Sequence, residues 1–197
     1  MTTGGRSLYE QKKRRIDDVI ALRRPDRVPT AFMATFWMAK YSGISHRRLM
    51  YDIDEGEAVL RRVLEELDPD VYMLPHLNTY IGPTMEKLGF KQLQWPGHGV
   101  GDNQPYQYLD REYMKAEEYD EFLFDPTGFY LRTYLPRVAE AFEGLEELHY
   151  LPGLHYFRLV AGIRSFAKPR VRQAFEKIIK AAEEVERMAA HHADFTQ

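Results

Sequence analysis

The chain has 197 residues, which is enough for one domain or slightly more. A net charge of −3 gives no general attraction to nucleic acid or to an anionic membrane, and the absence of cysteine excludes disulfides and thiolate metal sites. Small polar residues follow Met1 without an apolar leader, and no apolar run approaches the length of a membrane span. A soluble cytoplasmic protein is therefore expected.

The first half predicts a helix, a strand, a second helix and a second strand. Residues 7–23 have helical spacing; the basic run within them, 12–15, is followed by two aspartates and is typical of a solvated helix face. The apolar run 28–34 predicts a first core strand, and 47–51 a short helix. Asp54 is the expected N-cap of a helix that leads into a buried strand at 70–74. This order predicts a βαβ unit with parallel strands and a right-handed crossover.

The second half is less regular. Gly82-Pro83 and Gly89 predict the start and end of a short helix. Two short strands are expected around a glycine-rich loop, with Trp95 as a buried anchor beside it. These two strands are expected at 91–95 and 106–109. The remaining expectations are an acidic helix at 116–124, a mostly helical stretch at 128–142, an irregular stretch at 144–166, and a helix at 169–192. The last helix carries a predicted apolar stripe of Val171, Phe175, Ile178, Ile179, Ala182 and Val185.

Several segments resemble the uroporphyrinogen decarboxylase superfamily in the same order along the chain. The clearest is Pro25-Asp26-Arg27-Val28-Pro29, which follows the first helix. Residues 67–70 fit the second strand of that family, and residues 95–99, 105–108 and 112–116 resemble its methyltransferase-like branch. The resemblance implies an α/β fold, and it implies that 1–197 is the N-terminal part of a (β/α)8 TIM barrel. Because such a barrel takes about 250 residues, the barrel is expected to be incomplete in this chain.

Two departures decide which activity the resemblance implies. The decarboxylases of the family have an arginine-containing segment after the first strand, which binds porphyrin carboxylates, but residues 34–40 contain no arginine. Their aspartate after the second strand is replaced by Pro75. The resemblance therefore implies a corrinoid-linked methyltransferase, with no cofactor in this chain and the corrinoid on a partner protein. The alternatives are a divergent uroporphyrinogen decarboxylase and a non-catalytic half-barrel that acts by pairing with another chain.

The candidate catalytic residues are His76, after the second strand, and His98, between two glycines in the loop. They are expected to converge on one pocket, about 10 Å or less apart; the alternatives are a loop histidine bonded to backbone and an exposed turn histidine. The candidate substrate-binding residues are Thr35, Phe36, Trp37, Asn78 and Asp102. Aromatic residues after a strand are also common in cores, and aspartate is common in turns.

The expected partners follow from the same interpretation. They are a small organic substrate and either a corrinoid protein or a second chain that completes the barrel, and a homo-oligomer is expected. Two histidines are fewer than the three or four ligands of a zinc site, so no bound metal is predicted. Neither nucleic acid nor membrane is expected as a partner.

Overall fold

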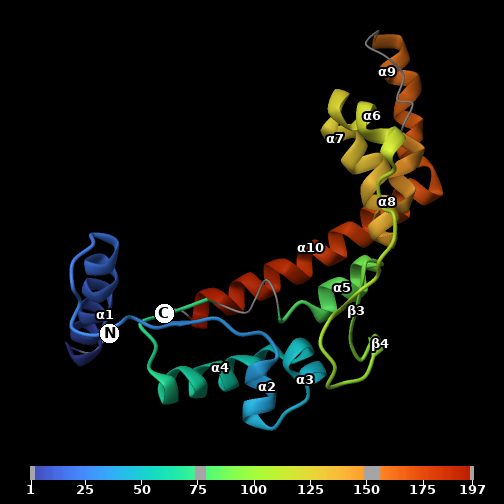
Figure 1. Cartoon of the computed structure of the whole chain (residues 1–197). Coiled ribbons are helices and arrows are strands. Elements are labelled where there is room, and N and C mark those ends of the chain that lie inside the picture. Colours follow the sequence, from blue (N-terminus) through green and yellow to red (C-terminus); the bar gives the residue numbers. More distant parts are fainter. Residues whose placement is uncertain (1–2, 74–78, 149–155, 196–197) are drawn as a thin grey trace. The chain divides into compact units, whose positions relative to one another are not determined.

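The computed structural model describes residues 3–73, 79–148 and 156–195. The chain divides into two compact units, Met1–Tyr80 and Ile81–Gln197. Figure 1 shows the elements of both units, coloured along the sequence. The described residues are mostly helical and contain only small sheets, so the fold is mixed α/β.

The first unit contains the predicted βαβ arrangement. Strands β1 (Ala31–Phe32) and β2 (Val71–Tyr72) are parallel, with Ala31 opposite Val71 and Phe32 opposite Tyr72. The prediction of parallel strands around a helical connection is confirmed. The helices of this unit are α1 (Thr3–Ile20), α2 (Trp37–Ser42), α3 (His46–Tyr51) and α4 (Ile53–Leu67).

Helix α4 supplies much of the core of the first unit. Its Leu60 and Val63 are fully buried, and the helix packs on α2 and α3. The helix begins after Asp52, whose carboxylate accepts a hydrogen bond from the Glu55 N–H at 3.0 Å. The predicted cap at Asp54 is wrong, because Asp52 has the extended backbone that a cap requires whereas Asp54 already lies in the first turn.

The two strands are shorter and more exposed than the sequence predicts. The expectation of a core strand at 28–34 and a buried strand at 70–74 is wrong for Val28, Val71 and Tyr72, which are all exposed. Within the described part of the chain, the β1–β2 sheet consists of these two strands alone. Their apolar side chains therefore lack the neighbours that would bury them.

The second unit begins with α5 (Gly82–Leu88), which ends at Gly89 in the left-handed conformation, as predicted. A three-stranded sheet follows, in the order β4-β3-β5, from β3 (Leu93–Pro96), β4 (Gly99–Val100) and β5 (Gln107–Tyr108). β3 and β5 are antiparallel, which confirms the two strands predicted around the glycine-rich loop. Trp95 is fully buried, as predicted.

The remainder of the second unit is helical. Pro136 lies in the first turn of α8, which directly follows the π-helical turn η3. The irregular structure predicted for 144–166 is wrong at both ends, since 144–148 and 156–166 are helical; residues 149–155 lie outside the described part. The elements are η2 (Ala116–Glu118), α6 (Tyr119–Phe124), α7 (Pro126–Phe129), η3 (Tyr130–Tyr134), α8 (Leu135–Val138), η4 (Glu140–Leu148), α9 (Tyr156–Gly162), η5 (Ile163–Ala167) and α10 (Pro169–Phe195).

Helix α10 packs on η4 and α5 with a face that overlaps the predicted one in part, at Val171 and at the half-buried Ile178. Its buried residues are Val171, Ala174, Ala181, Glu184 and Met188. Of the predicted stripe, Phe175, Ile179 and Val185 are exposed. At the first turn of α10 the backbones of α10 and η4 lie very close, since a Cβ on Gly144 would overlap the Arg170 carbonyl.

Candidate functional site

A pocket of about 590 Å³ lies beyond the carboxyl end of β1. Its described lining residues are Phe32, Met33, Ala34, Thr35, Trp37 and Leu67. Open parallel sheets and (β/α)8 barrels place their ligands at this end of the strands. The volume falls within the range of small-molecule pockets, about 300–1,000 Å³. This pocket is therefore the candidate ligand site.

Two aromatic rings form part of the wall of the pocket, Phe32 of β1 and Trp37 at the start of α2, and Tyr41 of α2 supports them. The Trp37 ring lies edge-to-face with Phe32, with centroids 5.9 Å apart, and stacks on Tyr41 one turn later at 4.8 Å. The Tyr41 hydroxyl donates a hydrogen bond of 2.7 Å to Glu66 near the end of α4, and this bond raises the pKa of the tyrosine. These contacts fix the position of the indole before any ligand arrives.

The chemistry of the lining limits what the pocket can bind. Of the lining residues that the structure describes, none is charged, and their polar side-chain groups are the Thr35 hydroxyl and the Trp37 indole N–H. Such a lining favours a small, largely apolar ligand with few hydrogen-bonding groups. It does not match a ligand with many carboxylates, which needs several cations.

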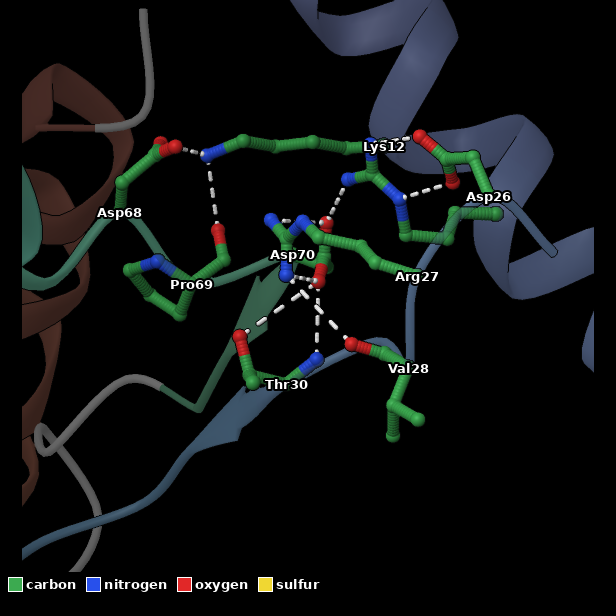
Figure 2. A network of polar contacts seen from close by, with 9 residues as sticks. Lys12, Asp26, Arg27, Val28, Thr30, Asp68, Pro69 and Asp70 are labelled. Atoms are coloured by element: carbon green, nitrogen blue, oxygen red, sulfur yellow. Dashed lines mark hydrogen bonds and ion pairs between the residues drawn. The ribbon is translucent and has the colours of Figure 1, made fainter.

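The opposite, amino-terminal end of the strands carries a network of ion pairs around Asp70 (Figure 2). The Asp70 carboxylate is fully buried; it accepts hydrogen bonds from the Thr30 N–H at 2.8 Å, from Arg27 at 3.0 Å and from Arg15. Arg15 also binds both oxygens of Asp26, at 2.6 and 2.7 Å. The network connects α1, the turn before β1, and the residue that precedes β2.

Asp70 remains ionised in this network. Burial alone would raise the pKa of its carboxyl, but the Thr30 N–H and the guanidinium groups of Arg15 and Arg27 outweigh burial and hold the pKa below its usual range. Asp70, which precedes β2, accepts a hydrogen bond from the backbone N–H of Thr30, which precedes β1. The carboxylate therefore holds the two strands together.

The network also accounts for much of the basic run in α1. Lys12 donates to Asp68 at 2.5 Å and to the Pro69 carbonyl at 2.8 Å, and Lys13 donates to Asp17 at 2.5 Å. With Arg15 bound to Asp26 and Asp70, these charges have partners within the first unit. The arrangement is that of an intramolecular ion-pair cluster.

The predicted site residues occupy different places. Thr35 and Trp37 line the pocket. Phe36 is buried in the core and stacks on His46, with centroids 4.7 Å apart. Asp102 lies in an exposed turn of the second unit.

Of the predicted histidines, His98 is exposed and stacks on Trp95, with centroids 4.0 Å apart and planes 8° from parallel. It therefore covers the buried anchor of its loop. His76 and Asn78 lie outside the described residues, so the pocket predicted to be shared by His76 and His98 stays a prediction.

Sequence reasoning missed four of the six described lining residues and the residues that support them. The missed lining residues are Phe32, Met33, Ala34 and Leu67, and Tyr41 and Glu66 hold Trp37 in place. The four-residue spacing of Trp37 and Tyr41 on a helix was a usable signal for their contact. Leu67 lies 30 or more residues beyond the other lining residues in the sequence, so no local pattern indicated that it would line the same pocket.

Across the described ranges, no three histidine, aspartate or glutamate side chains come together as a group that could hold a metal ion. The same ranges contain no helix with both the length and the apolar character needed to cross a membrane. Comparison with known proteins finds no matching family model, no matching curated protein and no matching solved structure.

Proposed function

We propose that this chain forms the N-terminal part of a (β/α)8 barrel of the uroporphyrinogen decarboxylase superfamily, of the corrinoid-linked methyltransferase type. The observation that carries the proposal is an uncharged aromatic pocket beyond the carboxyl end of a strand in a parallel βαβ unit. The order of the resembling segments along the chain favours this family. The uncharged lining of the pocket favours the methyltransferase type over the decarboxylase type.

In this proposal, the pocket binds the small organic substrate of a methyl transfer. Trp37 and Phe32 exclude water and stack on the substrate, and the Thr35 hydroxyl orients a polar group of the substrate. The corrinoid stays on its own protein and supplies the carrier for the methyl group. No lining residue that the structure describes titrates near neutral pH, so this wall acts by positioning and desolvation.

Methyl transfer by the complete gene product, with a methylated corrinoid protein and a thiol acceptor, tests the proposal. We expect activity, and we expect Trp37→Ala to lower it mainly through a higher KM, because the indole contributes binding. Tyr108→Ala, which removes an exposed ring in β5 of the second unit, is the matched control and should leave activity unchanged. Decarboxylation of uroporphyrinogen without methyl transfer would contradict the proposal and favour a divergent uroporphyrinogen decarboxylase.

A second candidate function is a non-catalytic half-barrel that pairs with another chain. The observation that favours it is the exposure of apolar residues on and beside β1 and β2, among them Val71 and Met73. Within the described residues, this two-stranded sheet presents unpaired strand edges, which favour pairing with further strands. Light scattering separates the candidates: a monomer that melts cooperatively would contradict an obligate half-barrel, and Val71→Lys should weaken any association through this sheet.

A further inference from the structure

Two exposed surfaces of the second unit combine large apolar side chains with charges of opposite sign. The acidic surface is formed by Glu117, Tyr119, Asp120, Leu123 and Phe124 of η2 and α6. The basic surface is formed by Arg158, Leu159, Val160, Ile163 and Arg164 of α9 and η5. On each surface the exposed apolar side chains are close neighbours in the sequence, and clustered exposed apolar groups are a common feature of interaction sites.

The acidic surface has its charges and its apolar groups on the same side of α6. Asp120 precedes Leu123 and Phe124 by three and four positions, so the three side chains are neighbours on the helix. Phe124 is 92% exposed. Among the residues that the structure describes, neither Glu117 nor Asp120 has an ion-pair partner. Their charges therefore remain available to a partner molecule.

The basic surface has the complementary composition. Val160 precedes Arg164 by four positions, as Leu159 precedes Ile163, and Val160 is 71% exposed. Residues 156–172 include five basic residues and no acidic residue. In the described part of the chain, Arg158 and Arg164 form no ion pair, whereas Lys168 and Arg170 bind glutamates of η4.

We propose that a second copy of this chain docks here, with the acidic surface of each copy on the basic surface of the other. In a two-fold dimer this contact forms twice, because residue i of one copy meets residue j of its partner and the reverse. Each copy carries both the acidic and the basic surface, so a second copy is complementary to the first at both surfaces. An anionic lipid surface would attract the basic surface but repel the acidic surface of the same unit.

The two kinds of side chain have separate roles in this contact. The apolar side chains lose water and supply most of the affinity, while the charges set the orientation and accelerate association. Exposed charge pairs are screened by salt, so the rate of dimer formation should fall as ionic strength rises. The contact does not involve the pocket beyond β1, so it goes beyond the proposed function.

Charge reversal of each surface tests the proposal in the full-length chain. We expect Glu117→Lys with Asp120→Lys, and separately Arg158→Glu with Arg164→Glu, to weaken dimerisation at least about tenfold in sedimentation velocity, because like charges then meet. Mixing these two variants should restore a dimer, since both contacts in the mixed dimer are again attractive. All four substitutions in one chain should also restore it.

The control is Glu183→Lys with Glu186→Lys, which makes the same charge change on exposed positions of α10. It should dimerise like the parent, and circular dichroism should show that every variant is folded. A monomeric parent, unchanged dimerisation of either reversed variant, or a mixture that stays monomeric would overturn the proposal. Dimerisation lost in Val71→Lys but kept in both reversed variants would place the contact on the β1–β2 sheet instead. Binding to anionic vesicles without dimerisation would also overturn it.

Discussion

Trp95 shows how one residue holds the glycine-rich loop in place. Its side chain is fully buried, and the His98 ring covers it from within the same tight turn. Gly97 and Gly99 have φ values of 78° and 84°, in the left-handed region that permits this turn. The stacking on Trp95 therefore gives His98 a structural role in this loop.

Trp95→Ala should therefore destabilise the protein strongly. We expect a loss of about 3–5 kcal/mol in the free energy of unfolding, because a large buried ring leaves a cavity. Chemical denaturation followed by circular dichroism measures it. The matched control is Trp37→Ala, where the ring is 46% exposed and the loss should be clearly smaller. Equal losses in the two variants would show that Trp95 is not an anchor.

Asp70 is the buried charge on which the strand pair depends. Asp70→Asn keeps the size of the side chain but removes the charge that Arg15 and Arg27 bind. We expect a loss of about 1–3 kcal/mol in the free energy of unfolding at neutral pH, the usual range for a weakened buried hydrogen-bond partner. Asp68→Asn, which changes an exposed carboxylate bound to Lys12 in the same region, should cost less.

The pH dependence of this difference follows from the direction of the pKa shift. The pKa of Asp70 is depressed in the folded state, so its contribution to stability is present above the unfolded pKa of about 4 and is lost as pH falls through the folded pKa. The difference in free energy of unfolding between the parent and Asp70→Asn should therefore shrink below about pH 4. Denaturation series at several pH values measure it, and a difference that stays constant with pH would contradict the assignment.

At the scale of elements, the contact between η4 and α10 requires a glycine. A Cβ on Gly144 would overlap the Arg170 carbonyl and approach the Val171 amide, and both are backbone groups that cannot move aside. Gly144→Ala should cost about 1–3 kcal/mol, as for other overpacked contacts. Gly101→Ala is the matched control, since a Cβ there would make only ordinary contacts and its φ is not positive. A Gly144→Ala variant as stable as the Gly101→Ala variant would contradict this packing.

Helices α5 and α10 are also joined by a buried carboxylate. Glu184 accepts hydrogen bonds from Lys87 of α5 and from Arg187 one turn later in α10. Burial would raise the pKa of Glu184, but these two cations outweigh it and lower the pKa. This charged residue therefore lies on the buried face of α10, where an apolar pattern would not place it.

At the scale of the whole molecule, each unit contains one of the two tryptophans. Trp37 belongs to Met1–Tyr80 and Trp95 to Ile81–Gln197, so each tryptophan reports on its own unit. In a Trp95→Phe background, Asp70→Asn should lower the midpoint of the Trp37 fluorescence transition. In a Trp37→Phe background, the same substitution should leave the Trp95 transition in place. Equal shifts in both backgrounds would show that the two units unfold as one.

The sequence by itself determined the local elements and their order. Proline and glycine positions located α5, the periodicity of apolar residues located α4 and most of α10, and the strand–helix–strand order predicted the parallel pairing of Ala31 with Val71. These features depend on residues close in sequence, where turn chemistry and helical spacing act directly. Trp95 could be predicted as buried for the same reason.

Only the tertiary structure decided which of several possible contacts each element makes. Spacing along α10 permits more than one partly apolar face, and packing on η4 and α5 buries the face that carries Ala181, Glu184 and Met188. Phe36 and Trp37 are adjacent and both aromatic, yet one enters the core and the other lines the pocket, because the chain bends before α2. The partners of Asp70 lie up to 55 residues away, a distance over which local pattern carries no information.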